Sequence, residues 1–166
     1  MTTNDATELP VLTALLAYGH THDDVARVAR GMPECRRLIE EILSLDHVRS
    51  ETTLSVGDVE FHQNKNGPFP NHQFRVSVRP QAGCAALNYM DNDDAEMPVA
   101  NSYNPRKSVP DVILIFNGST GLTFPRSAII SITDARRALL EWLQTRKRPT
   151  CIEWRPYDFV LRPDGP

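Results

Sequence analysis

The chain has 166 residues, with 18 Lys and Arg against 21 Asp and Glu, and 40% of its residues are hydrophobic. This composition is typical of a globular protein that buries one core. A net charge of -3 does not supply the basic footprint that nucleic-acid binding needs. No apolar run reaches the roughly 20 residues that cross a bilayer. We therefore expect a single domain, residues 1–166, with no membrane segment and no direct contact to nucleic acid.

The ends and the cysteines of the chain indicate a compartment. The first residues, MTTNDATELPVL, are acidic where a secretory signal carries Lys or Arg. Cys35, Cys84 and Cys151 are odd in number and far apart, with no CxxC pair. Such cysteines are typical of reduced core thiols. We expect a cytoplasmic protein without disulfide bonds.

The first 45 residues predict three helices. A short one lies around residues 12–16. A second follows the capping pair Thr21 and Asp24 and ends at Gly31. A third opens at Pro33, a favoured first helical position. Its apolar residues form one stripe: Cys35, Leu38, Ile39, Ile42 and Leu43.

From about residue 52 the hydrophobic period changes to two. Phe74, Val76 and Val78 alternate with Arg and Ser, which predicts a half-buried strand, and residues 84–90 are its expected hairpin partner. The pair Asn117-Gly118 indicates a turn. Further strands are expected at residues 59–63, 99–103, 112–116, 122–124, 129–132 and 151–154.

The last third predicts a long amphipathic helix. Thr133 is its expected N-cap, and the Asp134 carboxylate complements the helix dipole. We expect Trp142 and Trp154 to be largely buried. The predicted fold class is α+β: an antiparallel β-sheet with helices packed mainly on one face and an N-terminal helical segment. The stripe of the last helix comprises Ala135, Ala138, Leu139, Trp142 and Leu143.

One acidic cluster has two open interpretations. Residues 85–105 hold four acids and no Lys or Arg. The cluster is either a solvated hairpin turn or a negative protrusion that contacts a basic partner. Aromatic residues beside it are either core residues or interface anchors. The candidate binding residues are Asp91, Asp93, Asp94, Glu96, Tyr89 and Tyr103.

Catalytic and metal-binding motifs are missing from the sequence. His20 and His22 have no HExxH or CxxC to complete a zinc site. The DNDDAEMPVA stretch lacks the glycine of a calcium loop, and no GxSxG is present. The basic run at residues 146–149 fits the C-terminal end of a helix dipole. We expect no enzymatic activity, no metal and no cofactor.

Three segments together resemble the type-one immunity protein family of bacterial polymorphic toxin systems. They are AALNYM at residues 85–90, TFPRSAIISITDARRALLEWLQT at residues 123–145 and RPTCIEW at residues 148–154. The resemblance covers residues 74–155. It implies a small cytoplasmic protein that binds and neutralises a cognate toxin domain, often a nucleic-acid cytidine deaminase. It brings no active site with it.

The acidic cluster is consistent with this implied function. A deaminase presents a basic channel for nucleic acid, and carboxylates can lie there in place of phosphates. We therefore predict that the six candidate residues form the toxin-binding surface of a 1:1 complex. The alternative is a nucleic-acid-binding module that uses the basic C-terminal third. Residues 101–166 carry 10 Lys and Arg against 6 Asp and Glu.

Overall fold

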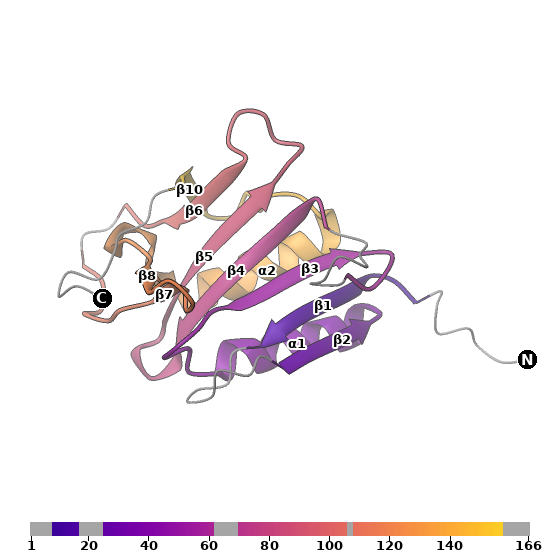
Figure 1. The fold of residues 1–166 in the computed structure, drawn as a ribbon, viewed down its shortest axis with the longest axis horizontal. Coiled ribbons are helices and arrows are strands. Elements are labelled where there is room, and N and C mark those ends of the chain that lie inside the picture. Colours follow the sequence, from indigo (N-terminus) through magenta and orange to yellow (C-terminus); the bar gives the residue numbers. More distant parts are fainter. Residues whose placement is uncertain (1–7, 17–24, 62–69, 106–107, 158–166) are drawn as a thin grey trace, which may run out of the picture.

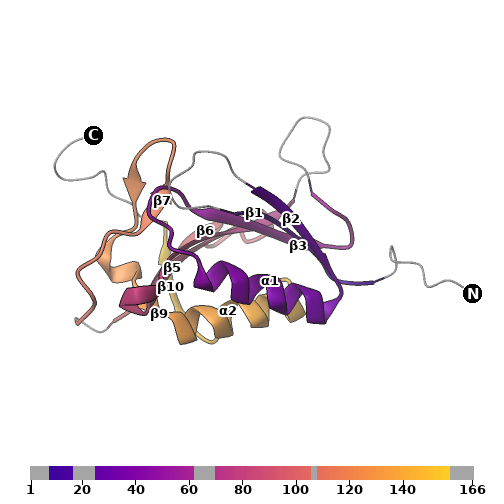
Figure 2. The same cartoon turned by 90° about the horizontal axis from the view of Figure 1, so that it is seen from below.

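A computed structural model describes residues 8–16, 25–61, 70–105 and 108–157. It shows an antiparallel sheet with two helices on one face (Figures 1 and 2). The α+β prediction is therefore confirmed. In chain order the elements are β1 (Val11–Leu16), β2 (Val25–Arg30), α1 (Met32–Ser44), β3 (Thr52–Gly57), β4 (His72–Arg79), β5 (Cys84–Asp91), β6 (Val99–Tyr103), β7 (Ile115–Asn117), β8 (Leu122–Thr123), β9 (Ile130–Ser131), α2 (Ile132–Thr145) and β10 (Glu153–Pro156).

The sheet runs in the order β10-β6-β5-β4-β3-β1-β2, and β9 pairs with β5. Its centre is the hairpin of β4 and β5, which pair from His72 opposite Asp91 to Arg79 opposite Cys84. A short 3₁₀ turn at Pro80–Ala82 joins them. The predicted strand through Phe74 and its hairpin partner are thus confirmed. The hairpin of β7 and β8 forms a separate two-stranded sheet.

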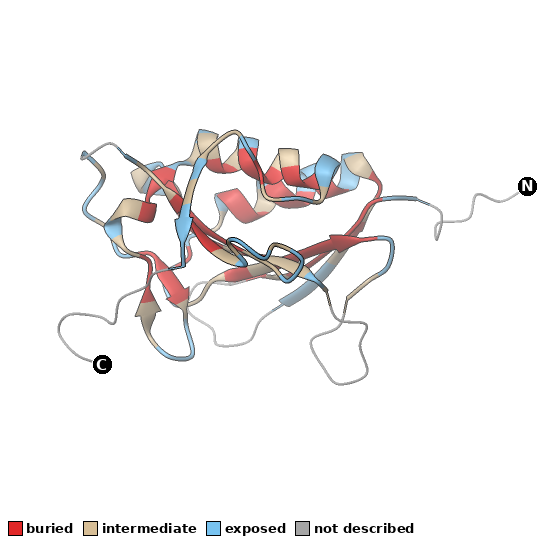
Figure 3. Cartoon of the chain, turned by 90° about the horizontal axis from the view of Figure 1, so that it is seen from above, coloured by how far each residue is buried: buried red, intermediate tan, exposed pale blue. Residues whose placement is uncertain are grey.

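Both long helices bury the stripes that their sequences predict. Each stripe faces the sheet (Figure 3), because a helix with one apolar face is stable only when that face is covered. The buried residues of α1 are Cys35, Leu38, Ile39, Ile42 and Leu43, and those of α2 are Ala135, Ala138, Leu139, Trp142 and Leu143.

Aromatic rings fill the centre of the core between α2 and the sheet. Trp142 is 0% exposed, and its ring lies edge-on to Phe74 with 4.8 Å between centroids. Phe74 also packs against Tyr89 at 4.8 Å. Trp154 lies at the margin of this cluster and is only half-buried. The burial prediction is therefore confirmed for Trp142, and Trp154 is partly buried against the same core.

The β7–β8 hairpin covers part of the opposite face of the sheet (Figure 2). Phe116 and Phe124 meet there with 5.3 Å between ring centroids. The Arg75 guanidinium on β4 lies 5.0 Å from the Phe116 ring centroid and pairs with Glu51 at 2.6 Å. The other oxygen of Glu51 accepts the Gly118 N–H at 3.0 Å. These contacts fasten the hairpin to the sheet.

The predicted N-terminal helical segment is wrong in its first two helices. Residues 11–16 and 25–30 form β1 and β2, which pair with Leu12 opposite Ala29. In β1 the apolar residues point to both faces of the sheet, so the run has no period of two to distinguish it from a helix. Gly31, at φ 82°, begins α1 and does not end a helix. Thr21, Asp24, His20 and His22 lie outside the described residues.

Other expected elements also differ from the structure. Residues 59–61, the described part of the strand expected at 59–63, form no strand, and β7 begins at Ile115 and not at residue 112. Ser131, and not Thr133, caps α2, and its side chain accepts the Asp134 N–H at 3.0 Å. The last strand begins at Glu153, because residues 149–152 form an irregular connection from α2. Neither described helix is long and apolar enough to span a bilayer.

Candidate functional site

The acidic residues lie on the loop between β5 and β6, which extends beyond the sheet (Figure 1). Two backbone hydrogen bonds close the base of this loop. The Asp91 N–H donates to the Pro98 carbonyl at 2.8 Å, and the Asn92 N–H donates to the Asn71 carbonyl at 3.0 Å. The loop is therefore joined both to itself and to the segment that leads into β4.

Two of the acids organise the loop. One Asp91 oxygen accepts the Asp93 N–H at 2.9 Å. One Asp94 oxygen accepts the N–H groups of Glu96 and Met97, at 3.1 and 3.0 Å. The hydrogen bond from Met97 is the largest cause that holds the pKa of Asp94 below its usual value. These carboxylates stabilise the turn, as Asp does at many tight turns.

The other two acids point to solvent. Asp93 and Glu96 are both exposed. The Asn71 amide donates weakly to Asp93, at 3.4 Å. The Glu96 carboxylate makes no hydrogen bond or ion pair with any described residue. These two side chains are therefore available for contact with a partner.

The two tyrosines do not lie with the acids on one surface. Tyr89 is 1% exposed and belongs to the aromatic core, with its hydroxyl 3.4 Å from Asp91. Burial raises the pKa of Tyr89 above its usual value. Tyr103 ends β6, about 13 Å of strand away from Val99 at the loop. The Arg155 guanidinium covers its ring at 4.2 Å. The structure thus groups the four acids on one loop. Tyr89 contacts Asp91 from the core beneath it, and Tyr103 lies away from the loop.

A cleft of about 680 Å³ separates this loop from the turn that follows α2. The turn carries the basic run at residues 146–149, and Arg146 begins it in the left-handed conformation with φ 58°. Arg148 crosses the cleft to Asp94 at 2.6 Å and donates to the Met97 carbonyl at 3.2 Å. The cleft is lined by His72, Asp91, Asp93, Asp94, Ala95, Glu96, Arg146, Lys147, Arg148, Pro149, Thr150, Ile152 and Trp154.

Glu141 of α2 holds the connection that leads from the turn to β10. Its two oxygens accept the N–H groups of Thr150 and Cys151, at 2.7 and 3.2 Å, and the Thr150 hydroxyl at 3.0 Å. Burial acts to raise the pKa of Glu141, but these hydrogen bonds outweigh it and the pKa is lowered. Residues 149–152 therefore have a defined position between the cleft and the sheet.

Two ring side chains, His72 and Trp154, line the cleft. The Trp154 indole N–H donates to the Pro149 carbonyl at 2.7 Å, which fixes the ring. His72 accepts the indole N–H of Trp142 on Nδ1 at 3.2 Å. Burial is the main cause that lowers the pKa of His72, so the ring is neutral at pH 7.

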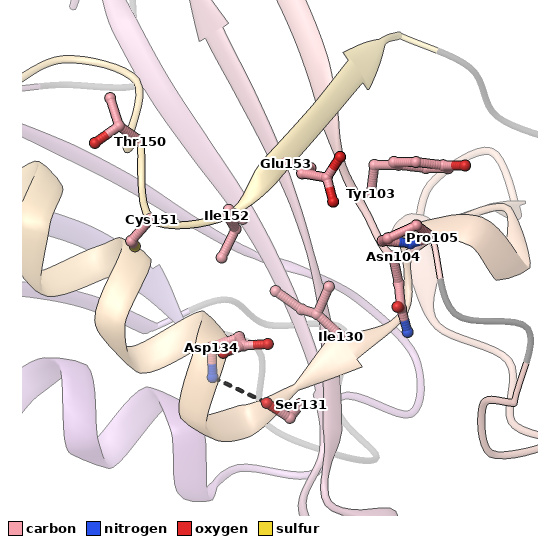
Figure 4. Close-up of a pocket in the computed structure, with 10 residues that line it drawn as sticks. All are labelled: Tyr103, Asn104, Pro105, Ile130, Ser131, Asp134, Thr150, Cys151, Ile152 and Glu153. Carbon is pink, nitrogen blue, oxygen red and sulfur yellow. Dashed lines mark hydrogen bonds between the residues drawn. The ribbon is translucent and has the colours of Figure 1, made fainter.

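A smaller cleft of about 320 Å³ lies on the other side of residues 149–152 (Figure 4). Thr150 and Ile152 line both clefts. Its rim carries the Glu153 carboxylate, and Asp134 of α2 contributes a second carboxylate. Arg137 pairs with Asp134 at 3.4 Å. Tyr103 lines this cleft and not the larger one.

Most cations of the C-terminal third are already paired. Among the described residues from 108 onward, only Lys147 has a cationic side chain with neither an ion pair nor a ring contact. The Arg155 guanidinium stacks on Tyr103. The ion pairs are Arg126–Asp111, Arg136–Glu40, Arg137–Asp134, Arg146–Asp58 and Arg148–Asp94.

Sequence reasoning missed the partners of the acidic loop. His72, Trp154 and the basic run at residues 146–149 surround the cleft, although they are distant from the loop in sequence. By sequence alone the basic run fits the end of a helix dipole. Its charge, opposite to that of the acidic loop, is the signal in the sequence that links the two segments. Within the part of the chain that the structure describes, no three or more His, Cys, Asp or Glu side chains are placed so that they could hold a metal ion together.

Comparison with known proteins adds one match. No curated protein and no solved structure matches the chain. The family model of Immunity protein Imm1 matches residues 23–156, which is more than half of the chain. The match covers the sheet from β2 to β10, both helices and the acidic loop. The chain therefore belongs to the Imm1 family of immunity proteins.

Proposed function

We propose that this protein binds one cognate bacterial toxin domain in the cytoplasm and neutralises it by covering its substrate cleft. The protein acts by 1:1 binding and performs no chemistry of its own. The family match over residues 23–156 is the observation that carries this proposal. An immunity protein implies a toxin partner. The proposed coverage of the toxin's substrate cleft rests on the acidic loop and the clefts beside it.

The toxin is proposed to be a nucleic-acid cytidine deaminase. Such an enzyme binds single-stranded or flipped bases in a basic channel. The β5–β6 loop extends beyond the sheet (Figure 1). It offers the complementary charge, because Asp93 and Glu96 on this loop are exposed. Complementary charge raises the association rate, which matters for a protein that must capture a toxin before it acts.

The proposed contact set is smaller than the six residues that the sequence suggests. Asp93 and Glu96 contact the toxin, while Asp91 and Asp94 hold the loop in shape. Tyr89 supports the loop from the core. Tyr103 belongs to a second part of the surface, at the smaller cleft.

Direct binding of nucleic acid through the basic C-terminal third has less support. Five arginines of that third are engaged in ion pairs with carboxylates. A phosphate backbone would have to compete with each of these. Salt-sensitive retardation of DNA or RNA in a gel would favour this alternative over the toxin.

Co-expression with the product of the adjacent gene tests the proposed function. The two proteins should co-purify at 1:1, measured by light scattering after gel filtration. Addition of the immunity protein should abolish conversion of cytosine to uracil in a single-stranded oligonucleotide by the purified toxin.

Two results would contradict the proposal at different levels. If the co-purified toxin cuts nucleic acid or modifies protein, the deaminase proposal is wrong and the immunity function stands. A neighbouring toxin domain that does not bind would remove the pairing itself.

A further inference from the structure

Resting on the proposed function, we propose that the larger cleft receives the side chain of one arginine of the toxin. The guanidinium lies against the ring of Trp154, and its N–H groups reach the carboxylates of Asp93 and Glu96. The ligand class is therefore a planar cation on an aliphatic chain. Three features of the cleft support this occupant.

The cleft is formed before any partner arrives. Arg148 joins the loop to the opposite turn through Asp94 at 2.6 Å and through the Met97 carbonyl at 3.2 Å. Glu141 holds the adjoining residues 149–152. Because both walls are already fixed, binding does not have to order them, and less affinity is lost.

The unpaired charge in the cleft is negative. Four carboxylates and three cations line it. Arg148 is neutralised by Asp94, and Arg146 pairs with Asp58 at 2.8 Å. What remains is three carboxylates against one ammonium group, so a cation is favoured. The remaining charged residues are Asp91, Asp93, Glu96 and Lys147.

The ring side chains that line the cleft suit a guanidinium better than an ammonium group. Trp154 lines the cleft and is partly exposed, and its ring is held by the hydrogen bond to the Pro149 carbonyl. The electron-rich face of an indole ring attracts a cation. A guanidinium stacks on such a face while its N–H groups reach carboxylates in the same plane. His72 beside it is neutral at pH 7, because burial lowers its pKa, and does not repel the cation.

A titration of the isolated protein tests this occupant. N-acetylarginine amide is the probe, and the NMR resonance of the Trp154 indole N–H is the readout. We expect a saturable shift with a Kd of about 1–10 mM, as for a single side chain. N-acetyllysine amide should bind more weakly. The neutral isostere N-acetylcitrulline amide should give no saturable shift, and an equal response to it would overturn the proposal.

Charge variants place the binding in the cleft. The double variant Asp93→Asn and Glu96→Gln should weaken arginine binding by about fivefold per carboxylate, the upper range for exposed ion pairs. Lys147→Gln should strengthen binding. The matched control Asp46→Asn and Asp111→Asn changes the net charge equally, outside the cleft lining. If the control pair weakens binding equally, the net charge of the protein, and not the cleft, attracts the arginine, and the cleft is overturned as the site.

The outcomes for the cleft and for the immunity function are separable. The arginine titration uses no toxin, so a failed co-purification contradicts the proposed function and not the ligand class of the cleft. A toxin complex that dissociates at the same rate with wild-type protein and with the Asp93→Asn and Glu96→Gln variant overturns the cleft and leaves the immunity function standing.

Discussion

The four acidic residues of the β5–β6 loop have two different roles. Asp91 and Asp94 accept backbone N–H groups, whereas Asp93 and Glu96 extend into solvent. Within one short acidic run, two residues therefore stabilise the turn and two provide its exposed negative charge. Sequence alone assigns the same property to all four. The hydrogen bonds separate them.

His47 is a buried residue whose role had no sequence signal. It is 0% exposed in the connection between α1 and β3. Nδ1 lies 2.9 Å from the Leu45 carbonyl, which can only accept, so this nitrogen carries the proton. Nε2 then accepts the Thr52 hydroxyl at 2.7 Å. Burial is the main cause that lowers the pKa of His47 to about 4 from 6.5.

This residue predicts a pH-dependent stability. Between pH 6.5 and 4 the unfolded chain binds a proton at His47 that the folded protein does not, so the free energy of unfolding falls as pH falls. The loss from this residue should reach about 3 kcal/mol by pH 4. Urea denaturation at a series of pH values measures it.

The variant His47→Gln is the control for this prediction. Its unfolding free energy should depend less steeply on pH across the same window, whatever its stability at pH 7. Parallel curves for the two proteins would show that another group titrates. An NMR titration of the wild-type imidazole gives the folded pKa directly.

At the level of secondary structure, the start of α2 distinguishes two candidate caps. Ser131 accepts the Asp134 N–H, while Thr133 lies inside the first turn. Ser131→Ala should therefore lower the free energy of unfolding by about 1 kcal/mol. Thr133→Ala should change it by less than half as much. Thermal or urea unfolding of both variants measures the difference, and an equal loss in both would contradict the cap.

The β7–β8 hairpin is docked through a position where only glycine fits. A Cβ on Gly118 would lie 2.5 Å from the Arg49 carbonyl and 2.8 Å from the Ser50 Cβ. Gly118→Ala should therefore displace the hairpin and cost about 1–3 kcal/mol, as overpacking does. Hydrogen exchange should accelerate at the Phe124 N–H, which donates to the Leu114 carbonyl at 2.8 Å.

Ser119→Ala is the matched control in the same turn. Ser119 is exposed, and its backbone N–H, not its side chain, donates to Asn117. This variant should leave both stability and exchange unchanged. Equal protection of Phe124 in the Gly118→Ala protein would show that the turn can move without releasing the hairpin.

For the whole molecule, the acidic loop lies at one end of a sheet whose helices cover one face (Figures 1 and 2). A partner that approaches the loop therefore meets the larger cleft directly. The smaller cleft adjoins the larger one across residues 149–152, since Thr150 and Ile152 line both. The proposed toxin surface follows from this arrangement and not from any one element.

This arrangement predicts how salt affects toxin capture. The Asp93→Asn and Glu96→Gln double variant should associate with the toxin several-fold more slowly at low salt, because rim charges act mainly on association. Its rate should also vary less with ionic strength. Stopped-flow kinetics at low and high salt measure both effects. Wild-type rates at both salts would show that the loop is a solvated turn and that the interface lies elsewhere.

Local pattern was sufficient wherever apolar residues lie on one face of an element and polar residues on the other. The stripes of α1 and α2 and the alternation in β4 predicted these elements and their buried residues, because period and burial then coincide. The Asn117-Gly118 turn was also predicted, and the Asn117 side chain accepts the Ser119 N–H at 2.9 Å. These parts could be derived from the sequence alone.

Only the tertiary structure decided the N-terminal strands and the site. β1 is apolar on both faces, so its pairing with β2 and β3, and not its own pattern, selects the strand. Asp94 and Arg148 are distant in sequence and meet because β5, β6 and the end of α2 converge. The sequence determined which residues carry charge. Long-range pairing decided which charges neutralise each other and which remain free for a partner.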